Sequence, residues 1–300
     1  MTVRRVPTSP CSKSADTRPA GQVADAGRGK LRVLSLFAGI GGFDLGLERT
    51  GGFETVAFCE IDPFCRRVLA KHWPHVRQYE DVRELTADRL AADGIAVDVI
   101  CGGFPCQDIS AAGRRGGMGG ARSGLWREYA RLIGEIRPRY VIVENSAGLL
   151  GLGLGVVLGD LAALGFDAEW DCLPAAILGA PHGRDRVWIT AYASKIEGIH
   201  KPDIGHELWR WLSDHRNAWA PCPWASSEAA VCRVDDGVPD RVDRTGALGN
   251  AVVPQIPELI GRAILASIRD SEIQVPPAWT TGPLLPPRAG AAGRFLRGDA

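Results

Sequence analysis

The fold follows from one stretch of the sequence, Leu31-Arg32-Val33-Leu34-Ser35-Leu36-Phe37-Ala38-Gly39-Ile40-Gly41-Gly42. Its apolar part, residues 31–37, predicts a buried strand, and the glycines after it predict a turn that a ligand can approach closely. A helical apolar pattern begins at Phe43. A strand, a glycine turn and a helix in this order favour an α/β fold with a ligand site where the backbone amides of the turn face outward.

Short apolar strands and amphipathic helices continue to alternate after this stretch. The predicted helices are 125–136, 156–164 and one that contains Phe64, Val68 and Leu69; the further predicted strands are 55–60, 97–101, 140–144, 168–173 and 186–191. Such alternation is typical of a mostly parallel sheet that is covered by helices on both faces. The sequence therefore predicts a doubly wound α/β fold, in which ligands bind beyond the carboxyl ends of the strands.

Composition divides the rest of the chain into regions. Residues 1–30 are rich in Ser, Thr, Pro, Gly and charge, which predicts a disordered tail, and residues 271–300 predict a second loose tail. The main domain is predicted over residues 31–193. Over residues 194–240 the alternation gives way to Pro, His, Asp and tryptophan, which predicts a small irregular second domain. Residues 241–270 return to the main domain through an apolar helix that opens after Pro254.

Charge and cysteine content limit the classes of function. The 35 basic and 35 acidic residues give no net charge, so any nucleic-acid contact must come from a local basic segment. The eight cysteines form no Cys-x-x-Cys pair or Cys/His ligand set, which argues against a metal site and a disulfide framework. No apolar run approaches roughly 18 residues, and no secretory signal is visible, so we expect a cytoplasmic protein without membrane contact.

One cysteine lies on a turn that glycine and proline shape. The segment Gly102-Gly103-Phe104-Pro105-Cys106-Gln107-Asp108-Ile109-Ser110 follows the predicted strand 97–101, and Pro105 fixes the chain before Cys106. Cysteine attacks as the thiolate, which nearby arginines and outward-facing amides favour. Cys106 is therefore the candidate nucleophile.

Two carboxylates follow predicted strands on the side of the glycine turn. Glu60 stands about twenty residues after the glycines, where an acid accepts hydrogen bonds from ribose hydroxyls in nucleoside-binding α/β folds. Asp81 belongs to the next strand-like segment, 79–82, and could accept from an adenine amino group. Asp44 occupies the place of the third glycine of the dinucleotide fingerprint, which argues against a nicotinamide enzyme.

Four motifs, taken together and in order, resemble the C5-cytosine DNA methyltransferases: the glycine turn, Pro105-Cys106-Gln107, Glu144-Asn145 and Gly249-Asn250-Ala251-Val252. The resemblance extends from about Leu31 to Ile268. It implies the S-adenosylmethionine-dependent methyltransferase fold, S-adenosylmethionine as cofactor, and methyl transfer to carbon 5 of cytosine in double-stranded DNA. The cofactor-binding residues that it implies are Phe37, Gly39, Ile40, Gly41, Gly42, Glu60, Ile61, Asp81, Val82, Pro105, Asn250 and Val252.

For the reaction, the resemblance implies that the Cys106 thiolate adds to carbon 6 of cytosine, so that carbon 5 can take the methyl group. Glu144 ends a predicted strand at the same sheet edge and is the candidate donor near ring nitrogen 3, with a pKa raised by burial. Arg184 and Arg186 stand at alternate positions entering a strand, so both could hold phosphate or the base carbonyl. The family's Gln-x-Arg-x-Arg begins with His182 here, and its Glu-Asn-Val ends with Ser146.

A cytosine within a duplex must be rotated out of the stack before a thiol can reach it. The stretch 113–124, rich in glycine and arginine, resembles the mobile loop that closes over the flipped nucleotide, and residues 194–240 take the place of a target recognition domain. The DNA-binding residues implied by the resemblance are Gln107, Ser110, Arg114, Arg115 and Arg122.

Two alternatives stay open at this point. One is an RNA cytosine-5 methyltransferase on the same scaffold, and the other is a non-catalytic relative that binds DNA, which the short insert and the two motif departures suggest. A monomer from a bacterium or a phage is expected. The sequence leaves open which DNA sequence is recognised and whether a cognate restriction endonuclease belongs to the same system.

Overall fold

The computed structural model describes residues 29–105, 124–178, 183–196, 198–214 and 249–273. Within these ranges the chain forms a seven-stranded sheet in the order β3-β2-β1-β4-β5-β7-β6. Strands β1 to β5 run parallel, while β7 lies antiparallel between β5 and β6. The strands are β1 Leu31–Leu36, β2 Phe53–Cys59, β3 Arg77–Tyr79, β4 Val99–Gly102, β5 Tyr140–Ser146, β6 Asp167–Pro174 and β7 Asp185–Tyr192. The predicted doubly wound, mostly parallel α/β fold is confirmed.

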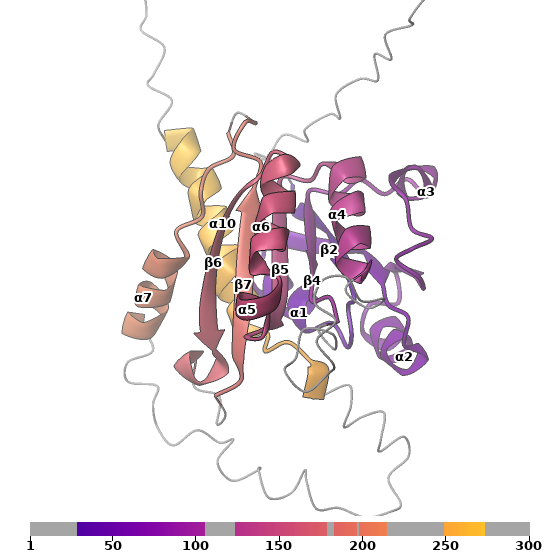
Figure 1. Ribbon diagram of the computed structural model, residues 1–300, viewed down its shortest axis with the longest axis horizontal. Coiled ribbons are helices and arrows are strands. Elements are labelled where there is room, and N and C mark those ends of the chain that lie inside the picture. Colours follow the sequence, from indigo (N-terminus) through magenta and orange to yellow (C-terminus); the bar gives the residue numbers. More distant parts are fainter. Residues whose placement is uncertain (1–28, 106–123, 179–182, 197, 215–248, 274–300) are drawn as a thin grey trace, which may run out of the picture.

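Helices cover both faces of this sheet (Figure 1). Helices α4, α5 and α6 lie in front of the sheet in this view, whereas α1 and α10 pack against each other behind it. The helices are α1 Gly42–Arg49, α2 Pro63–His72, α3 Ala87–Ala92, α4 Gly124–Ile136, α5 Leu149–Leu152, α6 Leu154–Ala163, the 3₁₀ helix η2 Ala175–Leu178, α7 Ile204–Asp214 and α10 Gln255–Ile273.

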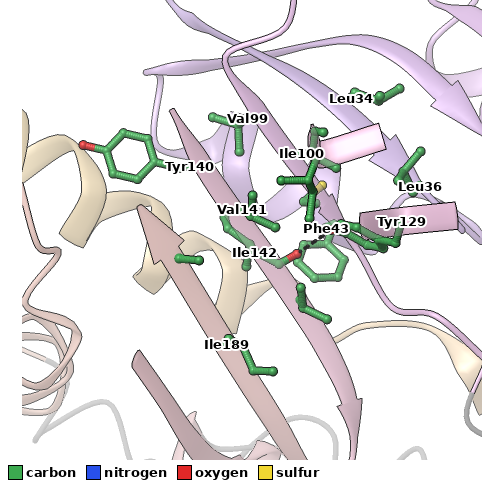
Figure 2. Packing of buried hydrophobic residues seen from close by; sticks show 14 of the residues in the cluster. Leu34, Leu36, Phe43, Val99, Ile100, Tyr129, Tyr140, Val141, Ile142 and Ile189 are labelled. Carbon is green, nitrogen blue, oxygen red and sulfur yellow. Dashed lines mark hydrogen bonds between the residues drawn. The ribbon is translucent and has the colours of Figure 1, made fainter. Parts of the chain in front are cut away.

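The core lies between the central strands and these two layers. β4 and the first four residues of β5 are completely buried, as expected for parallel strands with helices on both faces. Helix α4 contributes Trp126, Tyr129, Leu132 and Ile133, whose spacing puts them on one helical face. Figure 2 shows the Tyr129 hydroxyl donating a hydrogen bond of 3.1 Å to the carbonyl of Ile142, which satisfies a polar atom inside the core.

Local sequence signals set the start of the helix that follows β2. Pro63 occupies the first turn of α2, where its missing amide hydrogen costs no helical bond. The Asp62 carboxylate caps the helix, since its Oδ1 accepts from the amides of Phe64 at 2.7 Å and Cys65 at 3.1 Å. This cap fixes the direction in which the chain leaves β2 and so places Glu60 and Ile61 at the carboxyl edge of the sheet.

Two features of the fold differ from the sequence-based expectation. Residues 204–214 form helix α7, which packs against α10, where irregular chain was predicted. The apolar residues of this segment have the spacing of an amphipathic helix. The Trp, His and Pro residues in and around it make this helical period hard to recognise in the sequence. The predicted strand-like end at 79–82 stops at Tyr79, so Asp81 lies in the turn after β3. Residues 215–248 lie outside the described ranges, and the division into domains stays a prediction. Within those ranges, no helix combines the length and apolar character that crossing a membrane requires.

Candidate active site

The glycine turn after β1 is held from one side by Glu60. The turn uses left-handed backbone at Gly39, with φ 54°, and at Gly41, with φ 85°, which glycine adopts without steric cost. The Gly39 amide donates to Glu60 Oε2 at 2.7 Å, while Glu60 Oε1 accepts from the Asp62 amide at 2.8 Å. Each carboxylate oxygen has a further acceptor site, so Glu60 can hold the turn and still bind hydroxyl groups.

A cavity of about 390 Å³ opens beside this turn at the carboxyl edge of β1, β2 and β3. Its volume falls in the range of small-molecule sites. Its lining includes five of the predicted cofactor residues together with Cys59, Glu80, Arg83 and Leu125; the five are Phe37, Ile61, Asp81, Val82 and Pro105. The other predicted cofactor residues lie outside this lining, on or beside the glycine turn and in the last motif; they are Gly39, Ile40, Gly41, Gly42, Glu60, Asn250 and Val252.

The carboxylate of the cavity is paired with an arginine. Asp81 Oδ1 accepts from the Arg83 amide and from Arg83 Nε, both at 2.9 Å, and Asp81 Oδ2 accepts from Arg83 Nη2 at 2.5 Å. These hydrogen bonds to the Arg83 guanidinium lower the pKa of Asp81 below its ordinary value. Asp81 therefore stays ionised and keeps its capacity to accept a hydrogen bond from an amino group.

The last motif packs directly on the first. A Cβ atom on Gly42 would lie 2.5 Å from the carbonyl oxygen of Val252, so only glycine allows this approach. The Arg184 guanidinium reaches the same segment, where its Nη1 donates to the carbonyl of Gly249 at 2.5 Å. Residues 249–252 therefore bridge the glycine turn and the arginine pair, although they are distant in sequence.

Glu144 lies against the loop that follows β4. A Cβ atom on Gly103 would lie 2.6 Å from Glu144 Oε2, so the glycine makes room for the carboxylate. Glu144 Oε1 is 2.9 Å from Arg186 Nε. Burial raises the pKa of Glu144 above its ordinary value, although Arg186 and Arg184 oppose the shift. The structure thus brings Glu144, Arg184 and Arg186 together, and burial favours a proton on the acid.

Arg184 and Arg186 differ in what they contact. Arg186 pairs with Glu144 and also donates from Nη1 to the carbonyl of Asp185 at 2.9 Å. Arg184 is directed to Gly249, and burial together with the charge of Arg186 lowers its pKa. One arginine thus orients the acid, while the other links it to the last motif.

Asn145 fixes the loop before Cys106, although sequence reasoning assigned it no role. Its Nδ2 donates to the carbonyl of Phe104 at 3.0 Å, and its Oδ1 accepts from the amide of Ser146 at 2.8 Å. The side chain is buried with both polar atoms satisfied. The Glu-Asn pair itself was the available signal, since adjacent strand residues point to opposite faces of the sheet and can contact different groups there.

The predicted nucleophile and DNA contacts lie outside the described residues. These are Cys106, Gln107, Ser110, Arg114, Arg115 and Arg122, and His182 lies outside as well. Pro105 is the last described residue before Cys106. Since Pro105 lines the cavity and Gly103 lies against Glu144, the segment 103–105 connects the cavity with the acidic site.

The sheet order, the glycine turn and the acid–arginine pair define a doubly wound α/β protein whose ligand cavity and acidic site share one loop. The chain belongs to the C-5 cytosine-specific DNA methylase family, whose model matches residues 31–208.

Individual proteins are similar to parts of this chain. The type II methyltransferase M2.BsuMI of Bacillus subtilis (strain 168) is 36% identical over 169 residues, which are 54% of this chain and 42% of that protein. M.HgiBI of Herpetosiphon aurantiacus, also a type II methyltransferase, is 35% identical over 172 residues, which are 56% and 38% of the two chains. The matched region thus spans less than half the length of these relatives. Among solved structures, the Entamoeba histolytica methyltransferase EhMeth has a TM-score of 0.49 at 14% identity, with 60% of each chain covered.

Proposed function

We propose that the protein transfers a methyl group from S-adenosylmethionine to carbon 5 of a cytosine in double-stranded DNA. One observation carries the proposal beyond family membership. The segment 103–105, which leads to Cys106, lines the cavity through Pro105 and lies against the Glu144 carboxylate through Gly103. This reaction needs a methyl donor and a proton donor near one cysteine.

The described residues fit S-adenosylmethionine. The ionised Asp81 can accept hydrogen bonds from the adenine amino group, and Glu60 has acceptor sites left for the ribose hydroxyls. Phe37 and Ile61 offer apolar surface to the rest of the nucleoside. When bound, the cofactor supplies an electrophilic methyl group on a sulfonium.

Cytosine carbon 5 is a poor nucleophile until a group adds at carbon 6. In the proposed reaction the Cys106 thiolate forms a bond to carbon 6, and protonated Glu144 donates a hydrogen bond to ring nitrogen 3, where negative charge collects. Arg186 holds the Glu144 carboxyl in place. After carbon 5 is methylated, loss of its proton lets the ring double bond re-form as the sulfur of Cys106 leaves.

Access to the base requires flipping, and we assign DNA contacts to residues on the chain after Cys106. The arginines Arg114, Arg115 and Arg122 offer charge for backbone phosphates, and Gln107 and Ser110 stand next to the nucleophile in sequence. Because the two relatives above are named type II methyltransferases, we further propose that the protein protects DNA in a system with a restriction endonuclease. We also propose that it acts as a monomer.

Methyl transfer can be measured with tritiated S-adenosylmethionine on duplex DNA and on tRNA in parallel. We expect label in DNA and none above background in tRNA. Bisulfite sequencing of DNA from cells that express the protein would then report the modified base and its sequence context. Label in tRNA alone would contradict the DNA assignment, and cofactor binding without transfer to either substrate would favour a non-catalytic relative.

A further inference from the structure

The apolar side of the glycine turn is covered by Trp73, the residue after helix α2. A Cβ atom on Gly41 would lie 2.6 Å from Trp73 Cζ3 and 2.7 Å from Trp73 Cη2, so the indole occupies the space that a side chain would need. Ala38 of the same turn packs on the cluster of Phe58, Leu69 and Val76 to which Trp73 also belongs. Trp73 therefore contacts the turn at Gly41, whereas Glu60 holds it at Gly39.

The indole is held in one orientation by a carboxylate. Trp73 Nε1 donates to Glu48 Oε2 at 2.9 Å, and the other oxygen, Glu48 Oε1, accepts from the Thr55 amide at 3.2 Å. The ring also meets Phe58 edge-on, with centroids 5.5 Å apart and planes at 69°. Glu48 thus joins the end of α2 to α1, the helix that follows the turn, and to β2.

Gly41 is the N-cap of α1, and its backbone is left-handed, with φ 85° and ψ 28°. No side chain caps this helix end, so neighbouring groups must keep the turn in shape. Glu60 holds the turn at Gly39 by a hydrogen bond, and Trp73 closes it at Gly41 by contact. A ligand that binds the turn meets amides already in place, which reduces the ordering cost of binding.

We propose that Trp73, oriented by Glu48, is a positioning residue for cofactor binding. It sets the shape of the turn at Gly41 without lining the cavity. This inference rests on the proposed function, since it takes the ligand of the turn to be S-adenosylmethionine. It predicts a specific effect on the cofactor, whereas a residue that served only folding would affect every ligand through the amount of folded protein.

The test is calorimetric titration of the full chain with S-adenosylhomocysteine, alongside steady-state kinetics. Trp73→Phe keeps an aromatic ring over the turn but removes the donor to Glu48. Because the ring is then no longer held by Glu48 and the turn is less well ordered before binding, we expect the Kd and the cofactor KM to rise about tenfold, with kcat at saturating cofactor and the KM for DNA changed less than about twofold. Trp73→Leu should weaken binding further.

The control variant is Asp98→Asn. Asp98 is buried and bonds Arg32 Nε at 2.7 Å, before the start of β4 and hence at the opposite edge of the parallel strands. Asp98→Asn should lower the melting temperature at least as much as Trp73→Phe while leaving the Kd unchanged. A Trp73→Phe variant that remains folded by circular dichroism and binds as tightly as Asp98→Asn would overturn the proposal.

A double-mutant cycle with Glu48→Gln tests the orientation step. Glutamine has an NH2 group in place of one of the two carboxylate oxygens, so in the single variant either Trp73 Nε1 or the Thr55 amide faces another donor. Once Trp73 is phenylalanine, only the Thr55 amide needs the remaining oxygen. Glu48→Gln should therefore cost affinity in the wild-type background and very little in Trp73→Phe. Additive losses would overturn the role of Glu48. If the wild-type protein bound no S-adenosylhomocysteine, the proposed function itself would fail.

Discussion

The pKa values of two carboxylates, Asp81 and Glu144, are shifted in opposite directions although each carboxylate has an arginine partner. Asp81, in the cavity, has its pKa lowered by Arg83, whose side chain is 64% exposed. Glu144 has its pKa raised by burial, although Arg186 stands 2.9 Å away and is only 27% exposed. Desolvation therefore outweighs the arginine partner at Glu144 but not at Asp81. The arginine thus favours the ionised form of Asp81 in the cavity, whereas burial favours the protonated form of Glu144.

Removing the nucleophile should have the largest effect. We expect Cys106→Ala to reduce methyl transfer to background while S-adenosylhomocysteine still binds, because the carboxylates assigned to cofactor binding, Glu60 and Asp81, stay in place. Cys172→Ala, on β6, is the matched control and should retain activity. Glu60→Ala should show the reverse pattern, with weakened cofactor binding. Turnover by Cys106→Ala in the tritium assay would refute the assigned nucleophile.

Replacing the buried acid Glu144 should have the second largest effect on the rate of methyl transfer. Glu144→Gln removes the proton donor and should slow transfer about a hundredfold or more. In the wild type only protonated Glu144 donates, so the rate should fall as pH rises through its raised pKa. Glutamine does not titrate, and that alkaline decline should disappear from the kcat profile of the variant. Glu169→Gln, on β6, serves as the control. An unchanged alkaline limb in Glu144→Gln would show that another group produces it.

Replacing Asp81, the hydrogen-bond acceptor in the cavity, should have a smaller effect, which is confined to cofactor binding. Asp81→Asn removes the charge and one acceptor oxygen, which should raise the Kd for S-adenosylhomocysteine about tenfold. Glu80→Gln is the matched control, because Glu80 lines the same cavity but pairs with Arg66. Equal affinities of the two variants, measured by calorimetry, would contradict the role of Asp81.

A third carboxylate, Asp44, shows the effect of burial on the pKa where the hydrogen-bond partners are hydroxyl groups and not an arginine. Asp44 is completely buried, accepts from Ser35 Oγ at 2.9 Å and Thr55 Oγ1 at 3.0 Å, and has its pKa raised from 3.8 to about 7, chiefly by burial. Between these two values the unfolded chain loses the proton that the folded chain keeps. The free energy of unfolding should therefore fall as pH rises through this window, by about 4 kcal/mol from this group.

Asp44→Asn should remove this dependence with little change in kcat, since Asp44 does not line the cavity. Urea unfolding of both proteins at several pH values between 4 and 8 measures it. The stability of the variant relative to the wild type should increase with pH. A constant difference would mean that Asp44 titrates normally.

Local patterns in the sequence indicate the strand, turn and helix that position this site. The apolar run before Phe37, and Asp62 and Pro63 at the start of α2, act through neighbouring residues, so their structural consequences are readable in sequence. The insertion of β7 between β5 and β6 depends on long-range pairing, which alternation of apolar residues does not encode. The same holds for Asn145 on Phe104 and Trp73 on Gly41, which come from distant segments and depend on the fold.

Duplex DNA with 5-fluorocytosine at the target position shows whether Cys106 forms a covalent bond to the base, since fluorine leaves carbon 5 without a removable proton. With S-adenosylmethionine present, the account predicts a covalent complex that survives denaturing electrophoresis in the wild type and is missing in Cys106→Ala. Methylation of ordinary DNA with no such complex, or a complex that forms equally well in Cys106→Ala, would contradict it.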